Sequence, residues 1–438
     1  MIEVIVLFVL LALLIIIGVP IGVALGVATA VVLGTMTNLS LNILPQNAFT
    51  ALDSFPLMAI PFFIIAGNLM KSGGIAKRLV DTFNELIGWV TGGLAMATTA
   101  TCMFFAAISG SANATTSAVG SFMIPAMKEK GYDENFAAAL SAAAGTIGVI
   151  IPPSVPFVVY AVIANVSIGD MFLAGILPGV FIGVVLMIMC FFVAKANHYG
   201  GTGVRFSPTR LLKTLGSSIW AILTPVIILG GIYGGIFTPT EAAVVGIVYS
   251  LFVGFFVYRE LTWKNLVDCF RDTAHSSGVI LFTLGLAMSF AYFLTMQQIP
   301  AKIGAALSAI SSPIVTLLII NIILLIVGCF IDNFSAVAIL APIFVPIVKD
   351  FGMDPVHFGV MMTVNLAIGF VTPPYGVNLF VASAISDLRV EGIIRKIWLM
   401  IFLMLGCLLV ITFWEPMTMG LVYASREAAA AALAASAG

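Results

Sequence analysis

The sequence contains few charged residues, and their distribution fits neither a soluble domain nor a nucleic-acid-binding protein. Charged residues make up 8% of the 438 positions, whereas a soluble domain carries roughly a quarter. The 18 Lys and Arg are scattered along the chain, nearly balanced by 19 Asp and Glu, and form no basic stripe. The low content of charged residues excludes a soluble globular protein, and the lack of a basic stripe excludes a nucleic-acid-binding protein.

Motifs for catalysis are also scarce. His198, His275 and His357 stand alone, without an HExxH motif or an acidic partner at ligand spacing. Ser109 is not part of a GxSxG motif, and the phosphate-binding GxxxxGK[ST] motif does not occur. The five cysteines lack metal-ligand spacing and are expected to be small buried apolar residues. They are Cys102, Cys190, Cys269, Cys329 and Cys407. We therefore expect no enzymatic activity and no direct use of ATP.

Hydrophobic residues, by contrast, make up 61% of the chain. Apolar runs of 18 residues or more recur from end to end, and each is long enough to cross a hydrocarbon core of about 30 Å as a helix. Membrane β-strands would alternate in short segments, and these runs do not. The sequence therefore predicts an all-α polytopic protein embedded in the lipid bilayer.

The first apolar segment, residues 2–35, is predicted to form two short helices. As one helix it would be about 50 Å long, and Gly18 and Pro20 lie where it should break. Its beginning does not resemble a signal peptide, because Glu3 replaces the basic region and no small-residue cleavage site follows. We expect this segment to be retained as membrane helix.

Two later apolar segments, 90–127 and 313–348, are too long for a single crossing, and we interpret both as re-entrant hairpins. Fifteen of the 18 basic residues then share one side of the membrane, in keeping with the preference of Lys and Arg for cytoplasmic loops. If both segments were ordinary crossings, Lys128 and Lys130 would lie on the opposite side of the membrane from Lys71. The basic residues would then be divided less clearly between the two sides. The fifteen are Lys71, Lys77, Arg78, Lys128, Lys130, Lys195, Arg205, Arg210, Lys213, Arg259, Lys264, Arg271, Arg389, Arg395 and Lys396.

An internal repeat supports the hairpins. Residues 125–161 align without a gap on residues 346–382, at a constant offset of 221. The identities are Pro125 with Pro346, Lys128 with Lys349, Gly131 with Gly352, Asp133 with Asp354, Ile147 with Ile368, Gly148 with Gly369, Pro152 with Pro373, Pro153 with Pro374, and Ala161 with Ala382. With the topology above, the first hairpin opens to the cytoplasm and the second to the outside. This inverted repeat is typical of secondary transporters and favours alternating access.

The expected tips of the hairpins, residues 108–117 and 329–335, are small and polar within apolar segments. At membrane depth, backbone outside a helix survives only where protein or a water-filled cavity satisfies it, so the tips indicate a lined site. The alternative is that small residues permit close helix packing. Asp332 is the acid expected within the bilayer, either as part of a site or paired with a nearby helix N-terminus.

Each hairpin is followed by a helix predicted to break at a double proline, over residues 145–154 and 369–378. Two prolines remove two amide donors and free the carbonyls one turn earlier, around residues 148–151 and 369–372. Free carbonyls suit a small hard cation such as Na⁺, as in transporters with unwound helices. Ordinary structural kinks are the alternative interpretation.

The segment 234–243 reads as a helix start. Thr238 fits the N-cap position, Pro239 fits the first helical position, and Glu241 completes a capping box. We therefore expect Glu241 to cap a helix rather than to act in chemistry.

Several motifs together resemble one transporter family. They are Gly-Gly-Ile-Phe-Thr-Pro-Thr-Glu-Ala-Ala at 234–243, the Ser-Gly-Ser-Ala-Asn-Ala-Thr tip at 109–115 and both double-proline helices. Over residues 1–424 the chain resembles the large membrane subunit of tripartite ATP-independent periplasmic (TRAP) transporters. The resemblance implies an elevator mechanism driven by Na⁺ in the bacterial inner membrane. It also implies two partners, a small four-helix membrane subunit and a periplasmic binding protein that delivers an organic acid.

The substrate type and the site residues follow from the same resemblance. Family substrates include C4-dicarboxylates and sialic acids; general similarity favours a sialic acid, although no residue decides it. The implied first Na⁺ site comprises Ser109, Gly110, Asn113, Gly145, Thr146 and Val149. The implied second Na⁺ site comprises Gly328, Asp332, Asn333, Ser335, Gly369 and Thr372. Residues expected near the substrate are Ser111, Thr115, Ser154, Tyr375 and Asn378.

The chain is expected to divide into scaffold and repeats. The divisions are 1–54 (N-terminal scaffold), 55–197 (first repeat with its arm), 198–273 (connecting scaffold), 274–424 (second repeat) and 425–438 (an Ala-rich tail, either native or added in cloning). Three alternatives stay open. One is a similar transporter that works without a binding protein. The second is an ion channel. The third is an intramembrane enzyme that uses Asp332, which would need a second acid or a His nearby.

Overall fold

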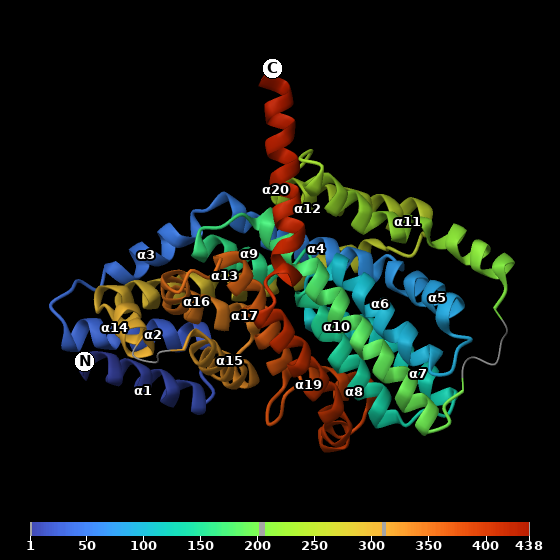
Figure 1. Ribbon diagram of the computed structural model, residues 1–438, viewed down its shortest axis with the longest axis horizontal. Coiled ribbons are helices and arrows are strands. Elements are labelled where there is room, and N and C mark those ends of the chain that lie inside the picture. Colours follow the sequence, from blue (N-terminus) through green and yellow to red (C-terminus); the bar gives the residue numbers. More distant parts are fainter. Residues whose placement is uncertain (1, 201–205, 309–311, 438) are drawn as a thin grey trace.

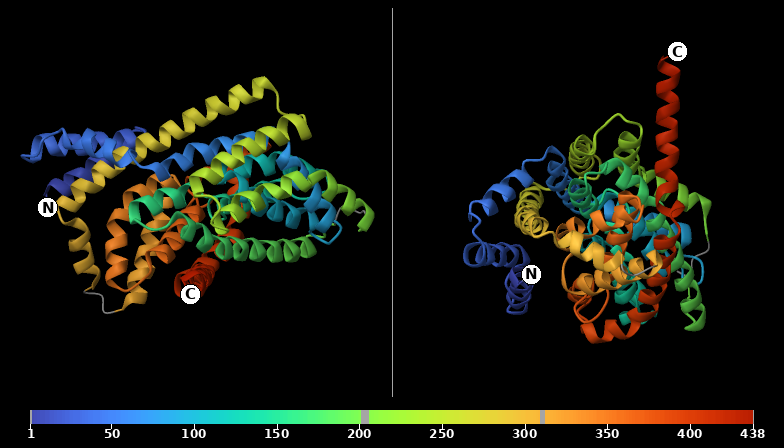
Figure 2. Two further views of the ribbon diagram at one scale, coloured as in Figure 1. Left: turned by 90° about the horizontal axis from the view of Figure 1, so that it is seen from above. Right: turned by 60° about the vertical axis from the view of Figure 1, so that its left-hand side comes forward.

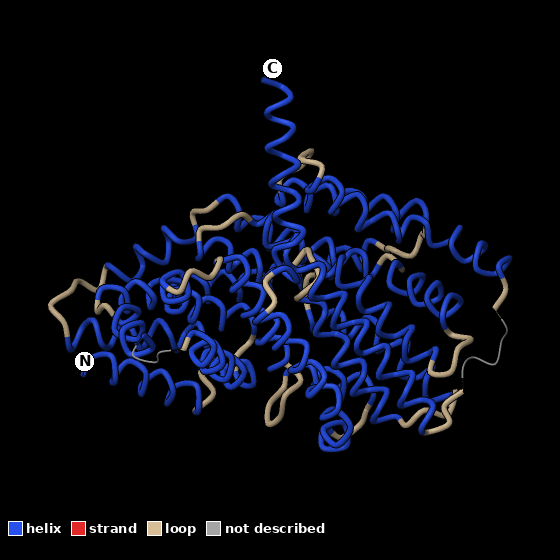
Figure 3. The backbone as a smooth tube through the Cα atoms, viewed as in Figure 1, coloured by secondary structure: helices blue, strands red, loops and turns tan. Residues whose placement is uncertain are grey.

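The computed structural model describes residues 2–200, 206–308 and 312–437, and traces them as helices joined by turns and loops without a strand (Figure 3). Eight helices among these residues are long and apolar enough to cross a membrane. The predicted all-α polytopic architecture is therefore confirmed. Arg205, one of the fifteen basic residues assigned to the cytoplasm, lies outside the described residues.

The helices form two hairpin-containing repeats and the elements around them. Before the first hairpin lie α1 (Ile2–Ile16), α2 (Ile21–Met36), α3 (Ile43–Leu52), η1 (Phe55–Met58), α4 (Ala59–Ser72) and α5 (Ile75–Ile87). The first repeat contains α6 (Gly93–Ser109), α7 (Ala112–Glu129), α8 (Glu134–Gly145), η2 (Thr146–Val149), α9 (Val155–Ala164) and α10 (Ile168–Ala196). Next come α11 (Pro208–Tyr233), α12 (Pro239–Phe252), η3 (Val253–Val257), α13 (Trp263–Met296) and α14 (Ile299–Ser308). The second repeat contains α15 (Pro313–Phe330), α16 (Asn333–Asp350), α17 (Pro355–Gly369), α18 (Val377–Ser386) and α19 (Val390–Phe413), followed by α20 (Pro416–Ala437).

The N-terminal helices lie along α13. Gly18 has a φ of 86° between α1 and α2, and Pro20 directly precedes α2, so the predicted break is confirmed. Helices α2 and α3 both pack against α13, which Figure 2 shows as one long helix at the edge of the molecule. Helix α4 contacts α13 and α12, and α11 contacts α12 and α5. These elements form a belt beside the two repeats, and we call them the belt helices (Figure 1).

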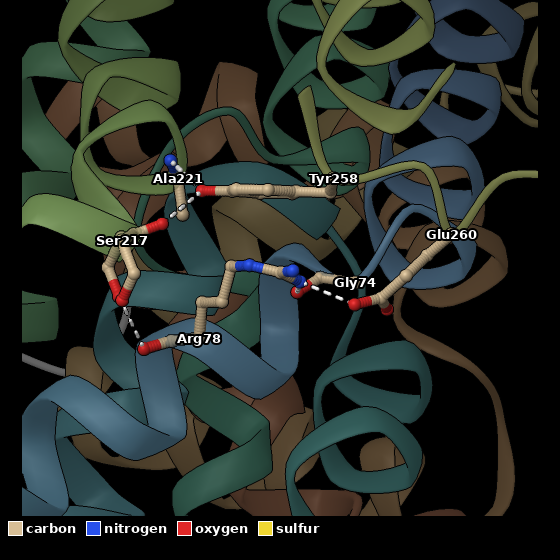
Figure 4. Close-up of polar contacts among 7 residues, drawn as sticks. Gly74, Arg78, Ser217, Ala221, Tyr258 and Glu260 are labelled. Atoms are coloured by element: carbon tan, nitrogen blue, oxygen red, sulfur yellow. Dashed lines mark hydrogen bonds and ion pairs between the residues drawn. The ribbon is translucent and has the colours of Figure 1, made fainter. Parts of the chain in front are cut away.

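A polar cluster fastens one corner of the belt, where α5 meets α11 and the loop after η3 (Figure 4). The Arg78 guanidinium lies 3.6 Å from the centroid of the Tyr258 ring and donates to Glu260 at 2.8 Å. The Tyr258 hydroxyl donates to the Ser217 carbonyl and accepts from the Ala221 amide, both at 3.2 Å. Arg78 thus joins α5 to the loop after η3, and Tyr258 joins that loop to α11.

At each predicted hairpin the chain forms two helices joined by a short turn, and the two turns lie at equivalent positions of the repeat. Helix α6 ends at Ser109 with Gly110, at a φ of 61°, as its C-cap, and the Ser111 side chain accepts from the Ala114 amide to cap α7. Asp332, 221 positions later, caps α16 by accepting from the Ser335 amide. Helices α7 and α16 begin and end at the same offset. The sequence repeat therefore extends through the tips.

The two repeats exchange helices. Helix α9 of the first repeat packs against α16 of the second, and α18 of the second packs against α7 of the first. Helices α8 and α17 likewise contact α19 and α10 of the opposite repeat. The repeats therefore form one interlocked core, which we call the hairpin core.

The last helix, α20, extends away from the rest of the molecule (Figure 1). It is tied to the hairpin core by an ion pair between Arg426 and Asp170 at 2.7 Å, and by Thr418, which lies 2.6 Å from the His357 ring. Two expected divisions, 273/274 and 424/425, fall inside the continuous helices α13 and α20. The backbone is therefore not interrupted at either position. The division into scaffold and repeats stays a prediction.

Candidate substrate and cation site

Both hairpin tips and both interrupted helices line one cavity of about 440 Å³ near the middle of the chain's fold. The first repeat contributes Ser109, Gly110, Ser111, Asn113 and Val149 to its wall. The second contributes Asp332, Asn333, Phe334, Phe370 and Val377. A cavity of this size lies in the range of small-molecule sites. The inverted repeat thus places corresponding polar tips at a single site.

The first tip is held by hydroxyl groups and by its contact with α9. Ser109 and Thr115 hydroxyls lie 2.8 Å apart, and the Thr115 hydroxyl donates to the Ser111 carbonyl at 2.9 Å. The Gly110 carbonyl accepts from the Val155 amide at 3.4 Å. A Cβ on Gly110 would lie 2.8 Å from the Pro153 carbonyl oxygen. Only glycine allows this approach between tip and interrupted helix.

The second tip uses a carboxylate and an amide. Asp332 Oδ1 accepts from the Ser335 amide at 2.9 Å, so the helix-capping alternative for Asp332 is confirmed while the residue also lines the cavity. The Asn333 amide group donates to the Thr363 carbonyl at 3.2 Å. This bond fixes the tip against α17.

Glycines bring each hairpin against its interrupted helix. A Cβ added to Gly145 would overlap the side chain of Thr116 on α7, and one added to Gly369 would overlap the backbone of Gly328 on α15. The predicted site residues Gly328 and Gly369 are therefore in direct contact. Thr116, which the sequence analysis did not include, lies beside the predicted first site.

Some of the backbone carbonyls freed near the double prolines accept hydrogen bonds from within the protein. The Ser154 hydroxyl donates to the Val149 carbonyl at 2.6 Å, and the backbone N–H of Asn378 donates to the Phe370 carbonyl at 3.0 Å. The Thr372 hydroxyl donates to the Ile368 carbonyl at 2.8 Å. The peptide bonds between the paired prolines are cis in both repeats.

The predicted site residues fall into two sets. Those that line the cavity are Ser109, Gly110, Ser111, Asn113, Val149, Asp332 and Asn333. Those that lie behind or away from its wall are Gly145, Thr146, Gly328, Ser335, Gly369, Thr372, Thr115, Ser154, Tyr375 and Asn378. Ser154 and Asn378 are buried, and Asn378 donates to the Ala142 carbonyl across the repeats at 3.1 Å. Tyr375 is 53% exposed.

Eight buried side-chain oxygens of the described residues have no hydrogen-bond partner, and two of these belong to residues at the tips. One is the Thr116 hydroxyl, next to Gly145, and the other is Asn333 Oδ1, whose amide nitrogen is already bonded. Buried polar atoms are nearly always satisfied, so an unsatisfied one calls for a water or an ion. Thr116 adjoins Gly145 of the predicted first cation site and Asn333 belongs to the predicted second, and neutral oxygens are ligands that fit Na⁺.

Two belt helices complete the cavity, and the sequence analysis missed both. Asn68 and Gly67 come from α4, and His275 comes from α13. Asn68 donates to Thr273 of α13 at 3.0 Å, which fastens these two helices to each other. His275 is exposed and adds an imidazole ring to the cavity wall. A lone histidine in an apolar run gave no sequence signal for this position.

Interlocked inverted hairpins and interrupted helices around a central cavity define the class as a polytopic secondary transporter. The chain belongs to the family described as "Tripartite ATP-independent periplasmic transporter, DctM component", whose model matches residues 8–417. The resemblance noted from the sequence is thereby confirmed.

Three curated relatives illustrate the similarity. An isethionate TRAP transporter permease protein, DctMQ, of Oleidesulfovibrio alaskensis is 48% identical over 86% of this chain, which spans only 59% of that relative's length. The C4-dicarboxylate large permease protein DctM of Pseudomonas aeruginosa is 41% identical over 87% of this chain and 90% of its own. The sialic acid large permease protein SiaM of Vibrio cholerae is 38% identical over 82% and 84%, respectively.

The solved structure of the YdaH transporter from Alcanivorax borkumensis has a similar fold. Its TM-score is 0.65, and the match covers 91% of this chain and 98% of that one. The two sequences are 16% identical, so this similarity concerns the fold alone.

Proposed function

We propose that this chain carries an organic anion across the bacterial inner membrane, coupled to the entry of Na⁺. The observation that carries the proposal is the single cavity lined by both hairpin tips and both interrupted helices. A site shared between inverted repeats can open to either side by movement of one body against another. In this proposal the hairpin core moves as an elevator along the belt helices.

Na⁺ coupling is supported by the chemistry beside the tips. The unsatisfied oxygens of Thr116 and Asn333, together with nearby backbone, are neutral donors of the kind that bind Na⁺. Na⁺ is here a transported ion, bound and released in each cycle. If two Na⁺ enter with a singly charged anion, one net charge moves, and a potential of 100 mV contributes about 2.3 kcal/mol.

The substrate class follows from the relatives and from the cavity. Isethionate, C4-dicarboxylates and sialic acid, the compounds in the relatives' names, share at least one anionic group. His275, Asn113 and Ser111 can donate hydrogen bonds to that group. We propose a small organic anion as substrate.

The partners belong to the same proposal. The family description is tripartite and periplasmic, which supports a small membrane subunit and a periplasmic binding protein as partners of this chain. The alternative is a transporter of the same architecture that works without a binding protein.

Uptake into proteoliposomes tests these points together. The chain and its small subunit are reconstituted, and uptake of isethionate, a C4-dicarboxylate and sialic acid is measured with Na⁺ or K⁺ outside, with and without the binding protein. We expect uptake of one anion only when Na⁺ and the binding protein are both present. Equal uptake in K⁺ would refute Na⁺ coupling, and equal uptake without the binding protein would favour the stand-alone alternative.

Variants locate the site. Asn113→Leu should abolish uptake because it removes a polar group from the cavity, whereas Asn47→Leu on α3, outside the cavity, should not. Asp332→Asn retains a capping oxygen but loses the charge, and Asp332→Leu loses both. Loss of uptake in both Asp332 variants assigns the role to the charge. Normal uptake in Asn113→Leu would return the first tip to a packing role.

A further inference from the structure

A second cavity lies away from the hairpin tips, between α8, α10 and α19. Its volume is about 200 Å³. One part of its wall is polar or charged and consists of Asn197, Tyr199, Arg395 and Lys396. The rest is apolar and consists of Phe136, Met189, Val193, Leu399 and Met400. We call it the α10–α19 pocket.

The pocket lies where α10 ends and α19 begins, at the base of the first hairpin. The sequence places this end of the helices on the basic, cytoplasmic side of the membrane. On α19, Trp398 is 44% exposed and Leu399 is 49% exposed. Tryptophan at such a position is typical of the interface between headgroups and acyl chains. Leu399 thus gives the pocket an exposed apolar rim, next to a tryptophan of the kind found at headgroup depth.

The charges in the pocket are arranged to attract an anion. Lys396 is 3.1 Å from Asp133, so its charge is partly used within the protein. Arg395 makes no ion pair with any described residue and is exposed. Its five fixed N–H donors match the oxygens of a phosphate group.

Tyr199 adds a second donor to the same wall. Its ring stacks on Tyr132 with centroids 4.5 Å apart, and its hydroxyl oxygen accepts from the Asp133 amide at 3.3 Å. The hydroxyl can still donate its own proton to a further acceptor. The ring is held in place before any ligand binds.

We propose that the α10–α19 pocket binds the phosphate headgroup of an anionic phospholipid. Arg395 and the Tyr199 hydroxyl contact the phosphate, and the acyl chains run along Val193, Leu399 and Met400. Basic pockets between membrane helices on the cytoplasmic side recognise anionic headgroups in this way. The pocket is smaller than a typical small-molecule site, which fits a headgroup and not a transported substrate.

Lipid binding to the purified full chain in detergent tests the proposal. Retained lipids are counted by native mass spectrometry, and thermal stability is followed during titration with phosphatidylglycerol or, as the neutral comparison, phosphatidylcholine. We expect phosphatidylglycerol to bind and to stabilise more strongly than phosphatidylcholine. Arg395→Gln should weaken phosphatidylglycerol binding roughly tenfold, equivalent to about 1.4 kcal/mol. Arg389→Gln, which removes an exposed charge from the start of α19 outside the pocket, is the matched control.

A pocket-filling variant separates shape from charge. Val193→Trp keeps every charged group and occupies the apolar part, so it should also weaken phosphatidylglycerol binding. The proposal is overturned if Arg395→Gln binds the lipid like the unaltered protein, or if Arg389→Gln weakens binding as much. It is also overturned if inorganic phosphate or glycerol phosphate stabilises the protein as well as the lipid, because the site would then bind a soluble anion. A final comparison repeats the mass spectrometry with the small membrane subunit bound. If the complex retains no phosphatidylglycerol, the small subunit and not a lipid covers the pocket, and the proposal is overturned.

Discussion

The contact between Gly369 and Gly328 is the most direct test of how the second hairpin meets its interrupted helix. A Cβ on Gly369 would overlap the Gly328 backbone, and a Cβ on Gly328 would lie 3.0 Å from the Leu366 Cα. Neither obstacle is a flexible side chain, so α15 and α17 would have to move apart. Overpacking of this kind costs about 1–3 kcal/mol.

We expect Gly369→Ala to lower stability by about this amount. Replacing Gly by Ala inside a helix gains up to about 1 kcal/mol, but Gly369 is the last residue of α17, so the gain there is small. Gly406→Ala, within α19, is the matched control, because nothing lies within 4 Å of its added Cβ. Its stability should be unchanged or raised by up to about 1 kcal/mol.

The assay is thermal unfolding of both variants in the same detergent, together with the Na⁺ concentration that gives half-maximal uptake. Gly369→Ala should unfold at a lower temperature and need more Na⁺, whereas Gly406→Ala should do neither. Unaltered unfolding of Gly369→Ala would show that α15 and α17 do not meet at these glycines. If stability is lowered but the Na⁺ requirement is unaltered, the contact between the two helices is supported, and Gly369 is not part of the proposed second cation site.

Three further predictions concern groups outside the cavity. The capping box of Glu241 is present, with its carboxylate accepting from the Thr238 amide at 2.8 Å, so Glu241→Gln should transport normally and Glu241→Ala should lower the thermal unfolding temperature. Burial raises the pKa of Asp133, but the Phe136 amide and the Lys396 ammonium outweigh this and hold that pKa below its ordinary value. The charged Asp133 side chain therefore stabilises the fold at pH values above its ordinary pKa. Asp133→Asn keeps the N-cap of α8 but has no charge, so the difference in stability between the two proteins should vanish as the pH falls through the pKa of Asp133 in the folded state. Arg78→Lys keeps a charge but loses the planar stacking on Tyr258, and should lower thermal stability by roughly 1 kcal/mol.

Features that depend on one residue's backbone chemistry were predictable from the sequence. Gly18 and Pro20 break a helix wherever they occur, and a double proline cannot continue one, so the N-terminal break and both interruptions were found. The Glu241 cap follows from three local positions and was also found. The tips were located by their small and polar residues within apolar segments, and the structure shows that α7 and α16 keep the offset of the repeat.

Features that depend on distant segments were not predictable. The side chains of Asn68 and Thr273 are joined by a hydrogen bond although 205 positions separate them. The sequence around either residue does not indicate this contact. Helix α5 carries Lys77, Arg78 and Asp81, so it did not register as an apolar segment, yet its other face packs against α6 and α11. The position of His275 in the cavity arises from the same long-range packing.

The exchange of helices between repeats determines when the first half of the protein can finish folding. Helix α9 is complete once Ala164 has been made, but its partner α16 begins at Asn333. At typical synthesis rates the intervening residues take about 10–30 s to appear. During that interval the first hairpin and α9 are in the membrane without their counterparts, so insertion of this half precedes its packing. A ribosome that stalls between the repeats would leave a membrane-inserted half with an unpaired polar tip, which is the kind of species that membrane quality control removes.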